Sequence, residues 1–418
     1  MHRTTPVVPH REELIYLLSE AAEVEHCLMC CYLYAGFSLK GPAETDLSTA
    51  EHEAVERWRR SIHAVATEEM LHLALVQNLL TSIGATPHLQ RPNFPVSPGI
   101  FPSGIVVQLR RFDAETLDHF IYLERPEAEE AAVPDGFEHP VAYARPGRPR
   151  QLMASAQDYA TVGALYHGIE QGFEELAAGL GEKALFVGDP GIQVGPDLLE
   201  LDGLATISDL ASVRRAIEGI IEQGEGARRS HDVSHYERFR RIRAEYEELK
   251  KTRPDFEPAH PVVGNPVMNE PTDPAERAFI DDPAARRVLD LANASYGLMV
   301  QCLARFFGHI EAPPRRRVLV DVAIEIMAKV LAPLAKVLAT LPASTRLPGQ
   351  TAGLTFTLPR TTHALSQPRA GWSLMHERAT ELAAAAAEHA GLDPVAAALS
   401  AAARRLAPAA LPVETERG

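Results

Sequence analysis

A stripe of apolar residues that runs from Val55 to Ile83 is interrupted at its centre by a glutamate and a histidine. Its members recur in alternating steps of three and four residues, the spacing of one buried face of a long amphipathic helix. Glu69 and His72 occupy consecutive positions on this face, one helical turn apart. An unpaired carboxylate is costly to bury, so a stable helix must neutralise Glu69. A Glu-x-x-His pair inside a helical bundle can hold a metal ion, and the stripe therefore predicts a metal site.

Other predicted helices also carry an ionisable residue in or beside their apolar face. They cover residues 11–39, 158–180, 208–226 (with Ser208 as its N-cap) and 235–250. In the same order, the ionisable residues are Glu25, Glu170, Glu222 and His235. Together with Glu69 and His72 they supply four carboxylates and two imidazoles, an inventory that suits iron or manganese. We expect two iron ions per chain, with manganese as the alternative and O₂ as co-substrate.

The second half of this predicted site needs a break in the chain. An unbroken helix would turn His235 away from Glu222, because the two residues are thirteen positions apart. Gly224 and Gly226 allow such a break after Glu222. Glu225 is an alternative ligand to Glu222 or a second-shell partner. Three more residues are candidates for the cavity wall or for acid–base chemistry: Tyr32, Tyr166 and His167.

The remaining chain divides into three parts. Residues 87–150 are rich in proline and glycine and predict an irregular crossover, with a weak strand pattern at 104–112. Residues 251–275 predict a linker between a bundle over 10–250 and a helical domain over 276–408. That second domain is expected to contain helices over 282–307, 315–341, 372–390 and 394–406. The predicted fold class is all-α, a four-helix bundle with a long crossover insert followed by a second helical region.

Charge and hydropathy exclude some partners. The formal net charge is −15, which argues against nucleic acid as a partner because nucleic acid needs a basic face. The most apolar late stretch, 324–341, contains two lysines and a proline, so no membrane span is expected. The four cysteines lie in helical patterns and predict small buried hydrophobes. We expect a cytoplasmic protein with a small-molecule substrate. The sequence is compatible with either a monomer or a homo-oligomer.

The sequence also resembles a known family. The segments LLSEAAEVEHCLMCCYLYAGFSL (17–39), ATEEMLHLALVQNLLTSIGATPHL (66–89), IIEQGEG (220–226) and HYERF (235–239) are similar to the ferritin-like iminophenyl-pyruvate dimer synthases. Related domains occur in violacein-pathway imine-coupling enzymes. The resemblance covers about residues 10–390, and it departs at Cys30-Cys31, where an apolar–proline pair is expected. It implies oxidative chemistry on imines or enamines of aryl pyruvates, or on other intermediates of bacterial specialised metabolism.

The leading functional hypothesis is therefore a non-haem dimetal oxidase or oxygenase whose substrate binds near the crossover. Three alternatives stay open: a metal-storage protein with ferroxidase activity only, a manganese catalase-like peroxide scavenger, and a scaffold that binds metal for stability alone.

Overall fold

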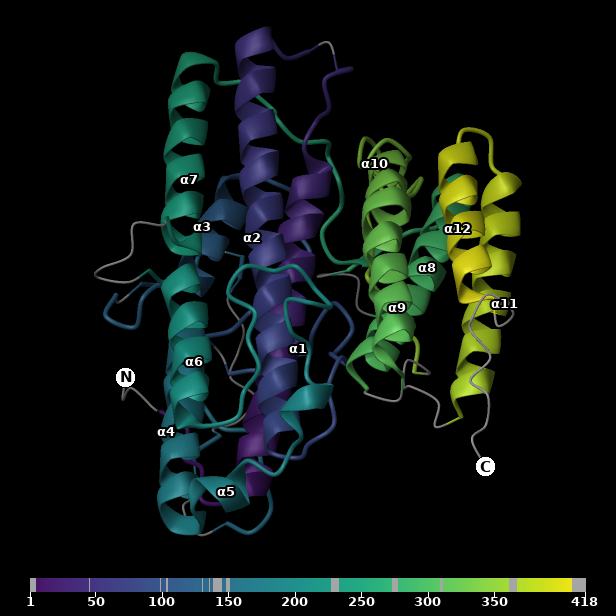
Figure 1. Cartoon of the computed structure of the whole chain (residues 1–418). Coiled ribbons are helices and arrows are strands. Elements are labelled where there is room, and N and C mark those ends of the chain that lie inside the picture. The colour runs from purple at the N-terminus through teal and green to yellow at the C-terminus, as the bar shows by residue number, and fades with distance from the viewer. Residues whose placement is uncertain are drawn as a thin grey trace. The chain divides into compact units, whose positions relative to one another are not determined.

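The structure is a computed structural model of the 418-residue chain. It describes residues 5–44, 46–97, 99–102, 104–129, 131–134, 136–137, 145–147, 151–226, 233–272, 277–308, 311–360 and 367–407. These form two compact units, one of residues 1–265 with 275–277 and one of residues 266–274 with 278–418. Both are built almost entirely from helices, so the predicted all-α class is confirmed (Figure 1).

Two long helices form the centre of the first unit. Helix α1 (Arg11–Ser38) packs against α2 (Thr49–Ser82), and α1 is buried over most of its surface. A capping box fixes the start of α2, since the Ser48 hydroxyl and the Glu51 carboxylate each accept a backbone hydrogen bond from the other residue. The expected stripe from Val55 to Ile83 is buried, and Glu69 and His72 are buried with it.

Two pairs of shorter helices complete the bundle. Helix α4 (Val162–Leu180) packs against α6 (Leu210–Gly224), and α3 (Ala114–Leu123) packs against α7 (His235–Thr252). In Figure 1, α7 follows α6 along the side of α2. The predicted chain break is confirmed, because α6 ends at Gly224 and α7 begins at His235.

Three expectations about this unit were wrong. The N-cap of α6 is Asp209 rather than Ser208, because the Asp209 carboxylate accepts a hydrogen bond from the Ser212 N–H. The crossover is not irregular throughout, since it contains α3, which begins after the N-cap Asp113. Residues 104–112 form no strand. A short helix α5 (Glu182–Leu185) and a 3₁₀ turn η1 (Pro190–Ile192) connect α4 to α6.

The second unit begins with a parallel pair of two-residue strands, β1 (Pro266–Val267) and β2 (Ala278–Phe279). Helix α8 (Pro283–Phe307) packs against α9 (Pro313–Ile326), and a π-helical turn η2 (Met327–Leu331) joins α9 to α10 (Ala332–Leu338). Helices α11 (Pro368–Ala387) and α12 (Asp393–Leu406) form a second pair. A cavity of about 700 Å³ lies between α8 and α11. Among the described helices, none is both long enough and apolar enough to cross a membrane.

Candidate metal centre

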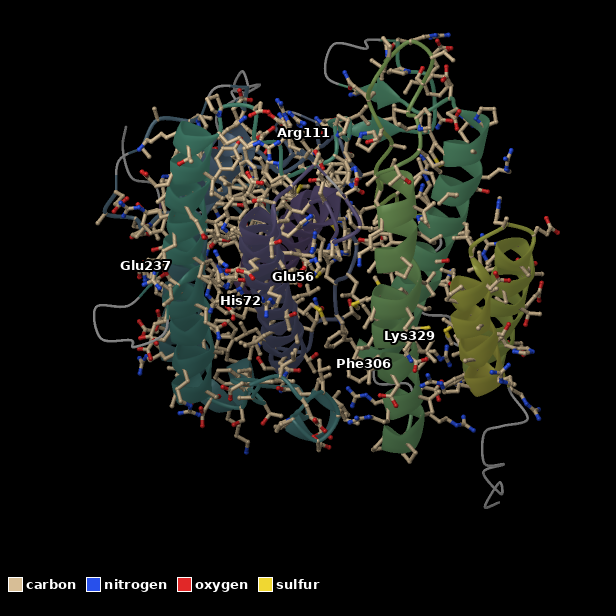
Figure 2. All side chains as sticks on the ribbon, turned by 90° about the horizontal axis from the view of Figure 1, so that it is seen from above. Glu56, His72, Arg111, Glu237, Phe306 and Lys329 are labelled. Carbon is tan, nitrogen blue, oxygen red and sulfur yellow. The ribbon has the colours of Figure 1, made fainter. Side chains whose placement is uncertain are left out.

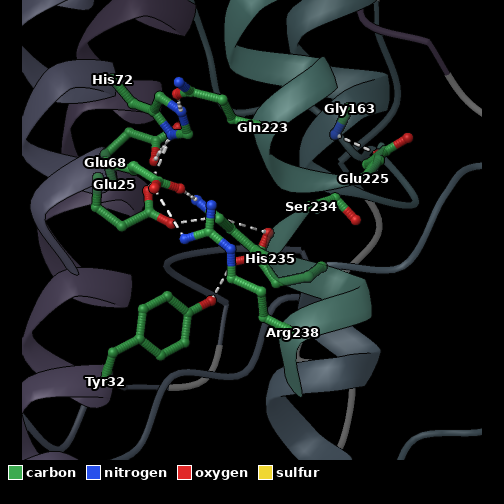
Figure 3. A network of polar contacts seen from close by, with 12 residues as sticks. Glu25, Tyr32, Glu68, His72, Gly163, Gln223, Glu225, Ser234, His235 and Arg238 are labelled. Carbon is green, nitrogen blue, oxygen red and sulfur yellow. Dashed lines mark hydrogen bonds and ion pairs between the residues drawn. The ribbon is translucent and has the colours of Figure 1, made fainter. Parts of the chain in front are cut away.

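Five buried side chains from four helices meet inside the first unit. They are Glu25, Glu69, His72, Glu124 and His235, here called the Glu/His cluster (Figure 3). They form two triads that share Glu69, and in each triad the candidate ligand atoms lie within 4.8 Å of one another. The exposed fraction is 7 % for Glu124 and at most 2 % for the other four residues. Figure 2 shows His72 among the helices of this unit, whereas Glu237 points outward from α7.

The ends of α3 and α7 bring two of the five cluster residues to α1 and α2. Glu124 is the C-cap of α3, and His235 is the first residue of α7, which Ser234 caps through the Glu237 N–H. Both residues extend an apolar helix face by one position, so their side chains point inward. Because these two side chains lie at helix ends, they can point into the cluster even where a continuous helix would direct them elsewhere.

Glu69 lies between the two histidines and contacts both. Its Oε2 is 3.1 Å from Nδ1 of His72, and its Oε1 is 3.1 Å from Nδ1 of His235. Each histidine has a second carboxylate on the same side, Glu25 Oε2 at 3.5 Å from His72 and Glu124 Oε2 at 3.6 Å from His235. The two rings are roughly parallel, with centroids 5.5 Å apart. This arrangement is a carboxylate bridge with one carboxylate and one imidazole on either side.

Hydrogen bonds from outside hold the terminal carboxylates in place. The Tyr166 hydroxyl donates to Glu25 Oε1 at 2.5 Å, and the Tyr32 hydroxyl donates to Glu124 Oε1. Both tyrosines therefore contact carboxylates of the cluster. Burial and the neighbouring carboxylates raise the pKa of both phenols well above the usual value, so the tyrosines stay protonated donors.

Burial and neighbouring charges inside the cluster shift its pKa values strongly. Burial and the charge of Glu69 raise the pKa of Glu25 to about 8. Burial alone would lower the pKa of His72, but Glu69 and Glu25 raise it to about 10. Burial likewise opposes the charged form of His235, yet Glu124, Glu68 and Glu69 raise its pKa well above the usual value. Without a metal, protons on the two imidazoles supply the positive charge that the carboxylates need.

A cation in place of these protons fits the donor set better. Nδ1 of His235 is buried and has no hydrogen bond of acceptable geometry, although Glu69 and Glu124 both lie near it. A metal ion accepts donation from that nitrogen and from oxygens of both carboxylates, without the directional limits of a hydrogen bond. Each triad therefore has a donor set that could hold a metal ion, and Glu69 is common to both.

A cavity of about 20 Å³ touches the cluster and has room for about one water-sized molecule. Glu225 lies on its wall, where its carboxylate accepts hydrogen bonds from the N–H of Gly163 at 3.1 Å and from the N–H of Glu127 at 3.3 Å. Burial raises the pKa of Glu225 to about 7. In this structure Glu225 is thus a cavity residue bonded to backbone amides, and it is outside both triads.

Three predicted site residues lie away from the cluster. Glu170 is half-buried because Ile169 takes the central position on the buried face of α4. Partial burial and the charge of Glu174 raise the pKa of Glu170. Glu222 is exposed because Gly224 continues the buried face of α6. His167 is also exposed, and its Nδ1 lies 3.4 Å from Glu127. Neither Glu170 nor Glu222 belongs to a triad, so the predicted ligand set needs this correction.

The structure adds three residues that sequence reasoning missed. Glu124 was overlooked with its helix, although Leu117, Phe120 and Glu124 follow the same three-and-four spacing as the other stripes. Gln223 and Glu68 contact the outer nitrogens of the two histidines, at 2.9 Å from His72 Nε2 and 2.8 Å from His235 Nε2 respectively. Gln223 follows the predicted ligand Glu222, and Glu68 precedes Glu69. No pattern in the sequence distinguishes either residue from its neighbours.

Comparisons with known proteins agree with this architecture. The profile of a family described as ferritin-like matches residues 18–244. A dichlorochromopyrrolate synthase from Lentzea aerocolonigenes is 29 % identical over 393 residues, which cover 85 % of this chain and 37 % of the relative. A 2-imino-3-(indol-3-yl)propanoate dimerase from Chromobacterium violaceum is 27 % identical over 378 residues, which cover 83 % of this chain and 34 % of the relative. The chain thus spans about a third of the length of these curated relatives.

A crystal structure of a ferritin like protein from Caulobacter vibrioides is similar with a TM-score of 0.50 and 18 % sequence identity. The similarity covers 85 % of this chain and 100 % of that chain, and it concerns the fold alone.

Proposed function

This chain belongs to the ferritin-like family, and from that premise we propose that its Glu/His cluster binds two metal ions and that the protein is a non-haem dimetal oxidase or oxygenase. Iron is the metal of first choice and manganese the second, since both accept mixed oxygen and imidazole ligands. The observation that carries the proposal is the pair of buried triads sharing Glu69. When bound, such a metal pair supplies electrons for the reduction of O₂.

The residues of the chain would hold and isolate this centre. Glu69 would bridge the ions, with Glu25 and His72 on one side and Glu124 and His235 on the other. Tyr166 and Tyr32 fix the terminal carboxylates by hydrogen bonds, so these need little reorganisation on metal binding. Burial of all five side chains keeps bulk water away from the reaction.

The proposed substrate is a small molecule of bacterial specialised metabolism, and an imine of an aryl pyruvate is the first class to test. The support is similarity to two relatives whose names specify a chromopyrrolate synthase and an indolyl imine dimerase. The cavity beside the cluster is too small for an aryl group, so this substrate requires the wall formed by Glu225 and its neighbours to open.

Metal content of the purified protein is the test. The double variant Glu69→Ala/His72→Ala should lose the two equivalents of iron that wild type retains, because it removes the bridge and one imidazole. Glu222→Ala is the matched control, since it removes an exposed glutamate outside both triads. Uptake of O₂ by the iron-loaded wild type should then depend on an aryl-pyruvate imine. If anaerobic reconstitution with Fe(II) or Mn(II) loads no metal, the cluster is a structural polar network.

Peroxide disproportionation by a dimanganese form is a second candidate. The cavity of about 20 Å³ favours it, because hydrogen peroxide is much smaller than an aryl-pyruvate imine and needs less opening of the wall to reach the cluster. Rapid release of O₂ from peroxide by the manganese-loaded protein, with no effect of an aryl-pyruvate imine, would select this candidate over the oxidase.

A further inference from the structure

The two halves of the Glu/His cluster match each other closely. Each half contains one histidine that points Nδ1 at Glu69 and one terminal carboxylate near the same nitrogen. In each half a buried tyrosine hydroxyl donates a hydrogen bond to that terminal carboxylate. The two expected metal positions therefore have the same kinds of carboxylate, imidazole and tyrosine contacts around Glu69.

The halves differ at the outer nitrogen of the histidine. Nε2 of His72 is 2.9 Å from the amide oxygen of Gln223, whereas Nε2 of His235 is 2.8 Å from a carboxylate oxygen of Glu68. Glu68 is held on its other side by Arg238, whose guanidinium donates to Oε1 at 2.8 Å (Figure 3). One imidazole thus faces a neutral acceptor and the other faces an anionic acceptor that an arginine keeps in position.

This difference changes how well each imidazole donates to a metal. A histidine that binds metal through Nδ1 carries its proton on Nε2, and an acceptor for that proton fixes the tautomer and increases the basicity of Nδ1. A carboxylate does so more strongly than an amide, because its charge stabilises the positive charge that develops on the ring. His235 is fully buried and the Glu68 side chain is three-quarters buried, so water screens their contact less than it would at the protein surface.

We propose that the two metal positions are unequal and that Glu68 is the positioning residue that makes them so. The position of Glu69, Glu124 and His235 would fill first and bind its ion more tightly. The position of Glu25, Glu69 and His72 fills second and exchanges its metal more readily. The inference rests on the proposed function, because it presupposes that the cluster binds metal.

Single-position variants separate the two affinities. His235→Ala leaves the His72 position, and His72→Ala leaves the His235 position. Each protein is titrated anaerobically with Co(II) and followed by its visible absorption, which reports coordination rather than activity. We expect His72→Ala to bind one Co(II) at least about tenfold more tightly than His235→Ala, since second-shell partners of a ligating histidine change affinity by about 10- to 100-fold.

Exchange of the outer partners tests the cause. Glu68→Gln in the His72→Ala protein should weaken Co(II) binding by about tenfold or more, and Gln223→Glu in the His235→Ala protein should strengthen it. A residue that only supported the fold would not produce this gain of affinity. Equal affinities in the two single-position variants, or no change on partner exchange, would overturn the inference while leaving metal binding intact. Failure of wild type to bind Co(II) would instead contradict the proposed function.

Discussion

At the scale of single residues, the strongest consequence of the cluster is competition between protons and metal. The imidazole of His72 keeps its proton up to a pKa of about 10 because Glu69 and Glu25 stabilise the charged ring. A metal ion must displace that proton to reach Nδ1. The raised pKa therefore opposes metal binding at neutral pH and ceases to oppose it only above about pH 10.

We predict that metal affinity rises with pH between about 6 and 10, by up to about tenfold per pH unit for each proton displaced. Anaerobic titration calorimetry with Co(II) in buffers of different ionisation enthalpy measures the protons released. At least one proton should be released per chain at pH 7. The same heat in every buffer would show that the imidazoles are already neutral, and the charge balance described for the cluster would be wrong.

Gly163 shows how closely the cavity wall is built. A Cβ atom at this position would lie 2.1 Å from Glu225 Oε1, so any side chain displaces the carboxylate from the amides that bind it.

Gly219 of α6 is the comparison position, because a Cβ atom added there would have no neighbour within 4 Å. We predict that Gly219→Ala raises the free energy of unfolding by about 0.5–1 kcal/mol.

Gly163→Ala should instead lower the free energy of unfolding by about 1–2 kcal/mol, because the partly buried carboxylate of Glu225 loses its donors. Urea unfolding of both variants makes the comparison. If the two alanine variants are equally stable, Glu225 can rearrange freely and is not fixed by its contact with Gly163.

Three of the residues that sequence analysis placed in the cluster share one property. Glu25, Glu69 and His72 interrupt long, regular apolar stripes, where helical spacing alone decides which way a side chain points. The prediction for Glu170 was wrong because Ile169, which is apolar, fits the helical spacing of α4 equally well and takes the buried position. Glu124 was missed because a ten-residue helix inside a proline-rich segment gives too few turns for a stripe to stand out.

At the scale of secondary-structure elements, breaks in the chain matter as much as the helices. The cluster lies where α3 ends, α6 ends and α7 begins, so two of its five residues, Glu124 and His235, depend on connections rather than on periodic helices. The two glycines after Glu222 indicated the break between α6 and α7. Nothing in the sequence indicated that Gln223, rather than its neighbour Glu222, would turn toward His72.

The crossover is tied to α1 by a buried ion pair. The Arg145 guanidinium donates to both carboxylate oxygens of Glu20, at 2.8 and 3.0 Å, and the Tyr159 hydroxyl donates to the same group at 2.9 Å. Both charged side chains are at least nine-tenths buried. Removal of one partner leaves the other charge buried and unpaired, which costs about 3–5 kcal/mol in typical proteins.

We therefore predict that Arg145→Met lowers the free energy of unfolding of the first unit by about 3 kcal/mol. Arg241→Met is the matched control, because Arg241 pairs with Glu237 on the exposed side of α7 and should contribute less than about 0.5 kcal/mol. Urea unfolding followed by helical circular dichroism compares the two. A loss no larger for Arg145→Met than for Arg241→Met would mean that the crossover does not depend on this ion pair.

At the scale of the whole molecule, all five residues of the Glu/His cluster belong to the first of the two units. A ligand that binds only the folded state stabilises it by an amount set by its concentration relative to its dissociation constant, about 2.7 kcal/mol at a hundredfold excess. Metal should therefore stabilise the unit that contains the cluster, whereas helices α8–α12 have an independent apolar core and bind none of the proposed ions.

Hydrogen exchange with and without metal tests this division directly. Saturating Co(II) should slow the exchange of amides near the cluster in α1, α2, α3 and α7, because opening of these helices releases the ion. Amides of α8–α12 should exchange at the same rate in both states. The Glu69→Ala/His72→Ala protein is the control, and metal should change none of its rates. Slower exchange in α8–α12 that disappears in this double variant would show that metal binding in the first unit also stabilises the second, and the two units would then have to be treated as one cooperative structure.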